Sequence, residues 1–345
     1  MHKNNFNLLR LLFALFVIIT HSFILTGYGE IDWLFTLTNA QVVISYIGVR
    51  GFFILSGYLI YQSVLRTTTL SDFFRNRFLR IFPGLIVVLL LTVILGYFVY
   101  NSDFYSYITN KFVWTYFPKN LKLFRLQGTI PGVFDTNPYK DDINGSIWTL
   151  QYEVICYSVI SLLVLIRKKH LLILSALCLF FFVSNVFFFE DYAKLQFVIY
   201  GQRVIDFGTF FFAGSLLACL KIENFKYKNT LLYLALGLLV ISLLFNVFRT
   251  VHLFALPVAV ILIGISSLKY VSGILSSIGD LSYGIYIYAW PVQQTLVYFF
   301  HPGVYWLTVY TILITIVLGY MSWHLVEKPA LKFKRHSGKS RFKTP

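Results

Sequence analysis

Charged residues are scarce in this chain: Asp, Glu, Lys and Arg make up only 12% of its 345 residues, whereas 58% are hydrophobic. Because about a quarter of the residues of a soluble globular domain are charged, this composition excludes such a domain. It indicates instead an all-α protein that crosses a membrane several times. No polar stretch is long enough to form a second domain with a core of its own.

Acidic residues are the scarcer of the two signs, with 14 Asp and Glu against 29 Lys and Arg, and the net charge is +15. Such an excess can indicate a nucleic-acid partner. Here, however, the basic residues fall in short segments between apolar runs. That distribution is the topology signal of a membrane protein, so we expect membrane lipids and no nucleic acid as partners.

Cysteine is also rare, and all three cysteines, Cys156, Cys178 and Cys219, lie in apolar runs. Because no two of them are closely spaced in the sequence, as paired cysteines would be, we interpret them as small core residues and not as disulfide partners. The sequence contains no cluster of metal-ligating residues either. We therefore expect neither a bound metal nor a permanently bound cofactor.

Long apolar runs, by contrast, recur along the whole chain and approach the ~20 residues that a helix needs to cross a bilayer. With the amino terminus in the cytoplasm, most Lys and Arg residues fall on the cytoplasmic side, as the positive-inside rule requires. We predict about ten transmembrane helices, both termini in the cytoplasm, and a basic cytoplasmic tail at 328–345. The predicted helices are residues 8–28, 40–63, 81–100, 146–166, 171–189, 200–220, 229–248, 252–268, 281–300 and 304–325.

Two segments depart from this pattern. Residues 65–80 are typical of an amphipathic cytoplasmic helix, which Ser71 would cap and which would end before Pro83. Residues 101–145 form one long outer loop, and loops of that length usually carry function. No internal repeat is visible, which counts against the duplicated architecture of many transporters.

A cation and a titratable side chain, Arg10 and His21, lie within the first predicted helix. Ionisable groups at membrane depth are costly and by default indicate a functional site. Eleven residues at ~100° each make three turns plus ~20°, so both side chains point the same way, ~16 Å apart along the axis. A buried, neutral His21 can act as a general base. The alternatives are a histidine that hydrogen-bonds between helices and an Arg10 that merely flanks the membrane.

Two further arginines, Arg77 and Arg80, share one helix face because they are three residues apart. Guanidinium groups in this arrangement can bind phosphates in a forked geometry. They can also extend toward lipid headgroups from a helix at the membrane surface. The spacing alone favours this second interpretation.

The start of the fourth predicted helix contains Trp148, Tyr152 and Glu153. Glu153 would lie about two turns inside the membrane, where a carboxylate needs a partner or a proton. A functional role is therefore favoured for Glu153, whereas Trp148 is alternatively an interfacial anchor.

The second predicted helix combines a cation, Arg50, with small residues between Gly48 and Gly57. The small residues favour close helix packing over a binding loop. Arg50 would neutralise either Glu153 or a substrate phosphate, and the spacing does not distinguish these two roles.

Together these segments resemble the acyltransferase 3 family of integral membrane acyltransferases. The resemblance runs in order from Arg10 to Pro329, and six weak motifs in the right order are specific as a set. One departure is Ala289, where many members have a histidine before Trp290, so no catalytic role is assigned there. The motifs are Arg-x10-His (Arg10, His21), Gly-Val-x-x-Phe-Phe-x-Leu-Ser-Gly (48–57), Arg-x-x-Arg (Arg77, Arg80), Trp-x-Leu-x-x-Glu (Trp148, Leu150, Glu153), Ser-Tyr-x-x-Tyr (282–286) and Glu-x-Pro (Glu327, Pro329).

The resemblance implies that residues 1–327 form an acyltransferase 3-like transmembrane domain. Its implied activity is transfer of an acyl group, usually acetyl, from cytoplasmic acyl-CoA to a hydroxyl of an extracytoplasmic acceptor. Acetyl-CoA would be a co-substrate, and the acceptor a surface polysaccharide such as O-antigen, or a lipid-linked oligosaccharide. The run Asn-Gly-Ser-Ile-Trp-Thr-Leu at 144–150 is similar to stand-alone polysaccharide O-acetyltransferases, which implies a multi-pass protein of the bacterial inner membrane.

The resemblance also implies where the acyl donor binds. Arg10, Arg77 and Arg80 would hold the nucleotide phosphates of acyl-CoA at the cytoplasmic side. The thioester would then reach His21, because ~16 Å along the helix is comparable to the reach of the pantetheine arm. His21 would deprotonate the acceptor hydroxyl for direct transfer, which is favoured over an acyl-enzyme because no strong nucleophile is evident.

On the acceptor side, Glu153 would orient His21 or position the sugar, while Arg50, Trp148 and Tyr152 would support the acceptor or the structure. A transporter or flippase is the alternative from another functional class, in which polar groups would line a translocation path. An acyltransferase that acts on a lipid, an antibiotic or a peptidoglycan sugar is a further alternative.

Overall fold

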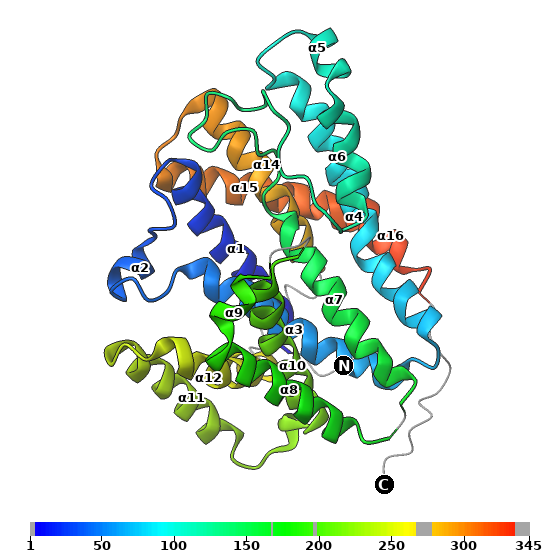
Figure 1. Ribbon diagram of the computed structural model, residues 1–345, viewed down its shortest axis with the longest axis vertical. Helices are drawn as coiled ribbons and strands as arrows, with labels where there is room; N and C mark the ends of the chain where they lie inside the picture. Colours follow the sequence, from blue (N-terminus) through cyan, green and yellow to red (C-terminus); the bar gives the residue numbers. More distant parts are fainter. Residues whose placement is uncertain (1–3, 167, 196–198, 267–277, 335–345) are drawn as a thin grey trace.

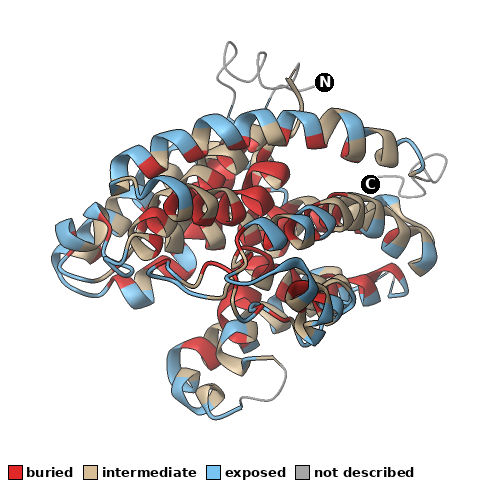
Figure 2. Ribbon diagram, turned by 90° about the horizontal axis from the view of Figure 1, so that it is seen from above, coloured by how far each residue is buried: buried red, intermediate tan, exposed pale blue. Residues whose placement is uncertain are grey.

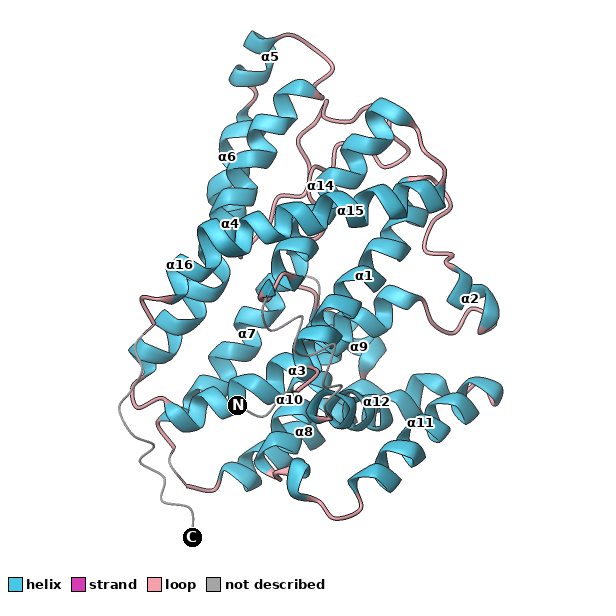
Figure 3. Cartoon of the chain, turned by 180° about the vertical axis from the view of Figure 1, so that it is seen from behind, coloured by secondary structure: helices cyan, strands magenta, loops and turns pink. Residues whose placement is uncertain are grey.

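The computed structural model describes residues 4–166, 168–195, 199–266 and 278–334. Within these ranges the chain consists of helices and connecting loops, without a β-sheet (Figures 1 and 3). The long helices are α1 (Phe6–Leu25), α3 (Ile44–Arg66), α4 (Leu70–Phe98), α6 (Lys111–Leu121), α7 (Leu150–Ser161), α8 (His170–Phe187), α10 (Gly201–Cys219), α11 (Lys228–Leu244), α12 (Phe248–Ile265), α14 (Ser282–Phe300) and α15 (Val304–Ser322). The short ones are α2 (Trp33–Leu37), α5 (Phe104–Thr109), α9 (Phe189–Ala193), α16 (Lys328–Leu331), the 3₁₀ turns at Ile147–Thr149, Leu162–Val164 and Ile222–Asn224, and a π-helical turn at Trp323–Glu327.

The described helices match the predicted membrane segments closely. Each of the ten predicted stretches overlaps at least one helix of the structure. Seven helical segments are long and apolar enough to cross a bilayer, so the chain is an all-helical, multi-pass membrane protein. The count of ten spans and the cytoplasmic position of both termini stay predictions. The seven segments are Phe6–Leu25, Ile44–Arg66, Leu70–Phe98, Ile147–Val164, His170–Phe187, Phe248–Ile265 and Val304–Leu331.

The prediction of a separate amphipathic helix at 65–80 is wrong. Thr69, and not Ser71, caps the helix by accepting a hydrogen bond from the backbone N–H of Asp72, and α4 then runs unbroken through Pro83 to Phe98. A proline inside a helix removes one backbone hydrogen bond. In an apolar environment no water competes for the remaining backbone groups, so the helix continues on both sides of Pro83.

The segment 101–145 is also more ordered than a single long loop. It contains α5 and α6, and the Tyr107 hydroxyl fastens α5 to α4 by donating to the Val93 carbonyl at 2.5 Å. Two isolated bridges, Tyr100 with Val133 and Thr129 with Asp142, hold the rest of the segment. The outer segment is therefore a packed structure that keeps its side chains in defined places.

Glycines allow α3 to pack closely against its neighbours, as the small residues predicted. A Cβ atom at Gly57 would lie 1.9 Å from the Phe211 carbonyl oxygen of α10, and one at Gly214 would lie 2.2 Å from the carbonyl oxygen of Ile54. Because such distances are sterically forbidden, only glycine permits this approach of α3 and α10. This packing fixes α3, from which both cavities described below take part of their walls.

Polar and apolar residues are distributed as expected for a protein in lipid. Buried residues gather where the helices meet, and exposed ones lie on the outer faces of the helices (Figure 2). Large apolar side chains such as Leu90, Leu234 and Leu313 are exposed, whereas Arg50 and Glu327 are buried. Ionisable side chains inside such a bundle need partners and commonly belong to a functional site.

Candidate functional site

Four cations surround a cavity of about 300 Å³ between α1, α3, α4, α7 and the start of α14, which we call the arginine cavity. Three of them, Arg10, Arg77 and Arg80, are the predicted phosphate-binding residues, and the fourth is Lys334. The structure therefore brings the three arginines together from two helices that are far apart in the sequence. The other polar residues of its wall are Ser56, Thr149, Glu153, Tyr157, Asp280, Ser282, Tyr283, Trp323 and Tyr286.

Two of these arginines already have acidic partners. Asp280 bridges them, because its carboxylate accepts from Arg10 Nη1 at 2.6 Å and also pairs with Arg80. Arg80 further contacts Glu327 at 3.2 Å. Burial alone would raise the pKa of Asp280, but the charges of Arg10 and Arg80 outweigh burial and hold that pKa below its ordinary value. Asp280 was not predicted from the sequence as a site residue. It lies two residues before Ser282, and its carboxylate accepts a hydrogen bond from the Ser282 hydroxyl.

Glu153 also faces the arginine cavity. Its Oε1 atom accepts hydrogen bonds from the hydroxyl of Ser56 at 2.8 Å and from that of Tyr157. Among the described residues, no hydrogen bond or ion pair joins Glu153 to His21 or to Arg50. The structure thus places this carboxylate in the wall of the arginine cavity, and the predicted roles, to orient His21 or to position the sugar, stay predictions.

His21 lies in a second and larger cavity, of about 940 Å³, which we call the histidine cavity. The edge of the imidazole meets Trp290, with ring centroids 4.8 Å apart and an angle of 85° between the planes. The Nδ1 atom is buried, and no described residue hydrogen-bonds to it. This geometry disagrees with a histidine that serves to hydrogen-bond two helices together, and it leaves the ring available to a ligand.

The wall of the histidine cavity comes largely from the outer segment and from the start of α7. It includes Asp142, whose pKa burial raises to about 7 and whose Oδ1 atom has no partner among the described residues. Gln151 likewise leaves its side-chain oxygen unbonded there. Its aromatic and charged residues are Glu30, Tyr46, Arg50, Arg125, Tyr139, Trp148, Tyr200, Arg203, Phe207, Tyr286 and Trp290.

Arg50 lines the histidine cavity and forms an ion pair with a buried residue, Asp206 of α10. Its guanidinium also lies 3.0 Å from the centre of the Tyr46 ring. The Tyr46 hydroxyl in turn is 2.7 Å from the Nε2 atom of His252. Arg50 therefore pairs with Asp206 and not with Glu153, and its assignment to acceptor or structural support stays a prediction.

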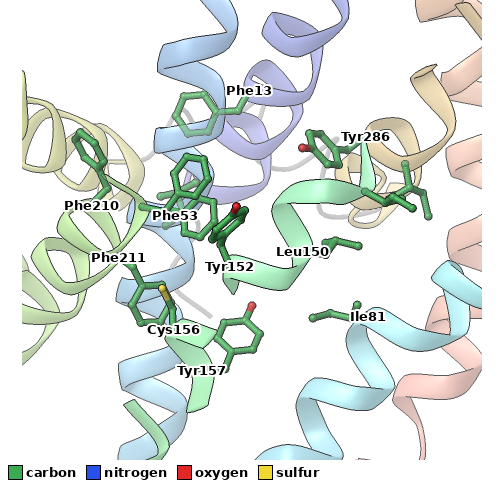
Figure 4. Packing of buried hydrophobic residues seen from close by; sticks show 14 of the residues in the cluster. Phe13, Phe53, Ile81, Leu150, Tyr152, Cys156, Tyr157, Phe210, Phe211 and Tyr286 are labelled. Atoms are coloured by element: carbon green, nitrogen blue, oxygen red, sulfur yellow. The ribbon is translucent and has the colours of Figure 1, made fainter. Parts of the chain in front are cut away.

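The two aromatic residues assigned to acceptor or structural support lie in different surroundings. Trp148 faces the histidine cavity, with the Arg203 guanidinium 5.2 Å from its ring. Tyr152 is buried and packs its ring against Trp148 and Phe207. Figure 4 shows Tyr152 within the apolar core beside Phe53. Tyr152 is thus a packing residue, whereas Trp148 offers a surface to a ligand.

The two cavities meet back to back. Val49 and Tyr286 line both of them. The Tyr286 hydroxyl is held by a hydrogen bond of 2.8 Å to the Thr149 hydroxyl, and its ring packs edge-on against Phe52. Arg10 and His21, on one face of α1, therefore open into cavities that little more than one layer of side chains separates.

Comparison with known proteins identifies the family of the chain. The sequence profile of the acyltransferase domain family matches residues 3–323. The chain belongs to the acyltransferase 3 family. The matched region contains His21, Glu153 and all three arginines of the arginine cavity, and it ends before Glu327 and Lys334.

Two curated relatives of this membrane acyltransferase cover almost the whole chain. An O-acetyl transferase of Shigella phage Sf6 is 30% identical over 95% of this chain and 96% of its own length. Nodulation protein 10 of Rhizobium leguminosarum bv. viciae is 28% identical over 96% of this chain and 94% of its own length. No solved structure matches the chain.

Proposed function

We propose that this acyltransferase moves an acetyl group from cytoplasmic acyl-CoA to a hydroxyl of a surface polysaccharide, such as an O-antigen, or of its lipid-linked precursor. It would work in the bacterial inner membrane, with acetyl-CoA as a co-substrate. The relative named as an O-acetyl transferase favours acetyl as the acyl group and oxygen as the accepting atom.

The observation that carries this proposal is the pair of adjoining cavities of different chemistry. The arginine cavity is cationic and suits a phosphate-rich donor. The histidine cavity is larger and combines aromatic rings with unbonded polar atoms, and it suits a hydroxyl-rich acceptor. Val49 and Tyr286 line both cavities and form the partition between them. A thioester that reaches past this partition from the arginine cavity would meet an acceptor beside His21.

Direct transfer needs one base and no covalent intermediate. His21 takes the proton of the acceptor hydroxyl, and the oxygen forms a bond to the thioester carbonyl carbon. The C–S bond then breaks, and the sulfur leaves with its electron pair and takes up the proton to give free CoA. The three cysteines lie away from this point, since none of them lines either cavity.

The roles of Arg50 and Trp148 follow from where they lie. Trp148 would stack against the face of a sugar ring, as aromatic side chains in binding sites commonly do. Arg50 would hold the wall of the cavity through Asp206. Glu153, bonded to Ser56 and Tyr157, would act on the donor side of the partition.

Labelled acetyl-CoA given to membranes that contain the protein tests this proposal. Label should enter surface glycan as an alkali-labile ester, and the same membranes without the protein should incorporate none. Label in a lipid that carries no glycan would instead identify a lipid acceptor. A transporter would cleave no thioester, so the release of free CoA separates that alternative from the proposal.

A further inference from the structure

The charges of the arginine cavity are not equally available to a ligand. Arg10 and Arg80 come from α1 and α4, Asp280 from the start of α14, and Glu327 from the π-helical turn after α15. Each of these two arginines contacts at least one carboxylate. Such a closed set of charges ties four elements together, and a ligand that took either arginine would have to displace a carboxylate.

Arg77 is different, because no described acidic side chain lies within ion-pair distance of it. Its Nη2 atom contacts only the Ser63 hydroxyl, at 3.3 Å. Its Nε atom is buried and has no hydrogen-bond partner among the described residues. A guanidinium whose buried Nε donor is unused among the described residues indicates an anion that is not part of the chain.

Lys334 is the second cation without a described acidic partner, and it lies beyond the transmembrane helices. It reaches the cavity through the turn that follows α16, where its backbone N–H donates to the Leu331 carbonyl at 3.2 Å. Burial, and then repulsion from Arg77, Arg80 and Arg10, lowers its pKa to about 8. The cavity therefore holds more positive charge than its carboxylates compensate.

We infer that Lys334 and Arg77 together bind the phosphate groups of the acyl donor, while Arg10 and Arg80 hold the cavity in shape. This assignment rests on the proposed function, because it takes the donor to be a phosphorylated acyl thioester. It gives the beginning of the carboxyl-terminal tail a part in donor binding. A lysine is suited to this role because its ammonium group binds phosphate as a point charge from a flexible stem.

The four cations thus have two different roles, phosphate binding and support of the cavity wall. Arg77 belongs to α4 and supplies a planar donor, whereas Lys334 follows the end of α16 and supplies a point charge. A ligand that carries several phosphates would neutralise both, and the pair would favour donors with the full set of phosphates over those that lack one.

Two matched substitutions in the tail test this inference. Lys334→Gln removes the positive charge of a side chain that lines the arginine cavity. Lys332→Gln is the control, because Lys332 is exposed and does not line the cavity. With purified protein, Lys334→Gln should raise the KM for acetyl-CoA and weaken equilibrium binding of free CoA about tenfold. The kcat should stay near that of the wild type, and Lys334→Arg should restore most of the affinity.

The outcomes separate this inference from the proposed function. If the wild type transfers acetyl from acetyl-CoA but Lys334→Gln and Lys332→Gln have the same KM, Lys334 does not bind the donor and the inference is wrong. If the wild type neither binds CoA nor transfers acetyl, the proposed function itself fails. A lower kcat at unchanged KM in Lys334→Gln would likewise contradict a role in binding. Thermal unfolding of each variant confirms that the compared proteins are folded.

Discussion

The arginine cavity and the histidine cavity differ in how many of their buried polar groups have partners among the described residues, and in the arginine cavity the Nε atom of Arg77 is an exception to the general pairing. In the first, Asp280 and Glu327 neutralise Arg10 and Arg80, so most of its charge is fixed inside the protein. In the second, His21, Asp142 and Gln151 keep polar atoms without a described partner. Because buried polar atoms rarely stay unbonded, the second cavity is prepared for the polar atoms of a ligand.

This difference indicates two kinds of recognition on either side of one partition. A donor that is the same in every cycle can be bound by a rigid, charged cavity with few open contacts. An acceptor with many hydroxyls needs several separate hydrogen-bonding positions, and the histidine cavity offers these on α1, α7 and the outer segment. A substitution at a residue that lines only one cavity should leave the other cavity intact.

The largest effect is expected from the histidine cavity. His21→Ala removes the proposed base, so acetyl transfer should fall by about 10²- to 10⁴-fold, the usual contribution of general acid–base catalysis. The control is His324→Ala, because His324 lines neither cavity and its Nδ1 atom contacts the Tyr320 carbonyl one turn earlier in the chain. If His21→Ala kept full acetylation at normal expression, His21 would not be the base.

In the arginine cavity, Asp280→Asn should act on stability. It leaves Arg10 and Arg80 facing each other without their shared carboxylate. Removing one member of a buried charge pair costs about 3 kcal/mol, which thermal unfolding in detergent would detect. Asp191→Asn, which breaks an exposed pair with Lys194, should cost at most about 1 kcal/mol. Equal losses in the two variants would show that the bridge is not structural.

Asp142 should make the stability of the outer segment depend on pH. Burial raises its pKa to about 7 from an ordinary 3.8, so the folded protein binds a proton that the unfolded chain has released between these values. The free energy of unfolding should therefore fall as the pH rises from 4 to 7. In Asp142→Asn this part of the slope disappears, so the melting temperature of the variant should fall less between pH 4 and pH 7 than that of the wild type. Parallel pH profiles for the two proteins would contradict a buried carboxyl here.

The smallest effect is expected at the partition. Tyr286→Phe removes the hydroxyl that Thr149 holds at 2.8 Å but keeps the ring. One hydrogen bond is worth about 1 kcal/mol, so transfer should slow about fivefold while CoA binding is unchanged. Tyr305→Phe is the control, because Tyr305 is exposed. A CoA affinity that fell together with the rate would show that Tyr286 belongs to donor binding alone.

The sequence predicted local features well because helix periodicity is a local property. The common facing of Arg10 and His21, and the glycines that let α3 approach α10, follow from residues close together in the chain. The continuation of α4 through Pro83 was missed because the cost of a proline depends on what surrounds the helix.

The charge partners could not be predicted in the same way. Arg50 meets Asp206, which is 156 residues away, and Arg80 meets Asp280, which is 200 residues away. Spacing carries no information about such distant pairs, so it could not choose between the possible partners of Arg50. For the same reason it could not place Glu153 on the arginine side of Tyr286.

If donor binding and chemistry belong to separate cavities, CoA binding to purified His21→Ala and to purified Arg77→Gln will differ. His21→Ala should bind CoA with wild-type affinity although it transfers acetyl at least about a hundredfold more slowly. Arg77→Gln should bind CoA more weakly by about tenfold or more. Loss of CoA affinity in His21→Ala as large as that in Arg77→Gln would contradict the separation of the two cavities.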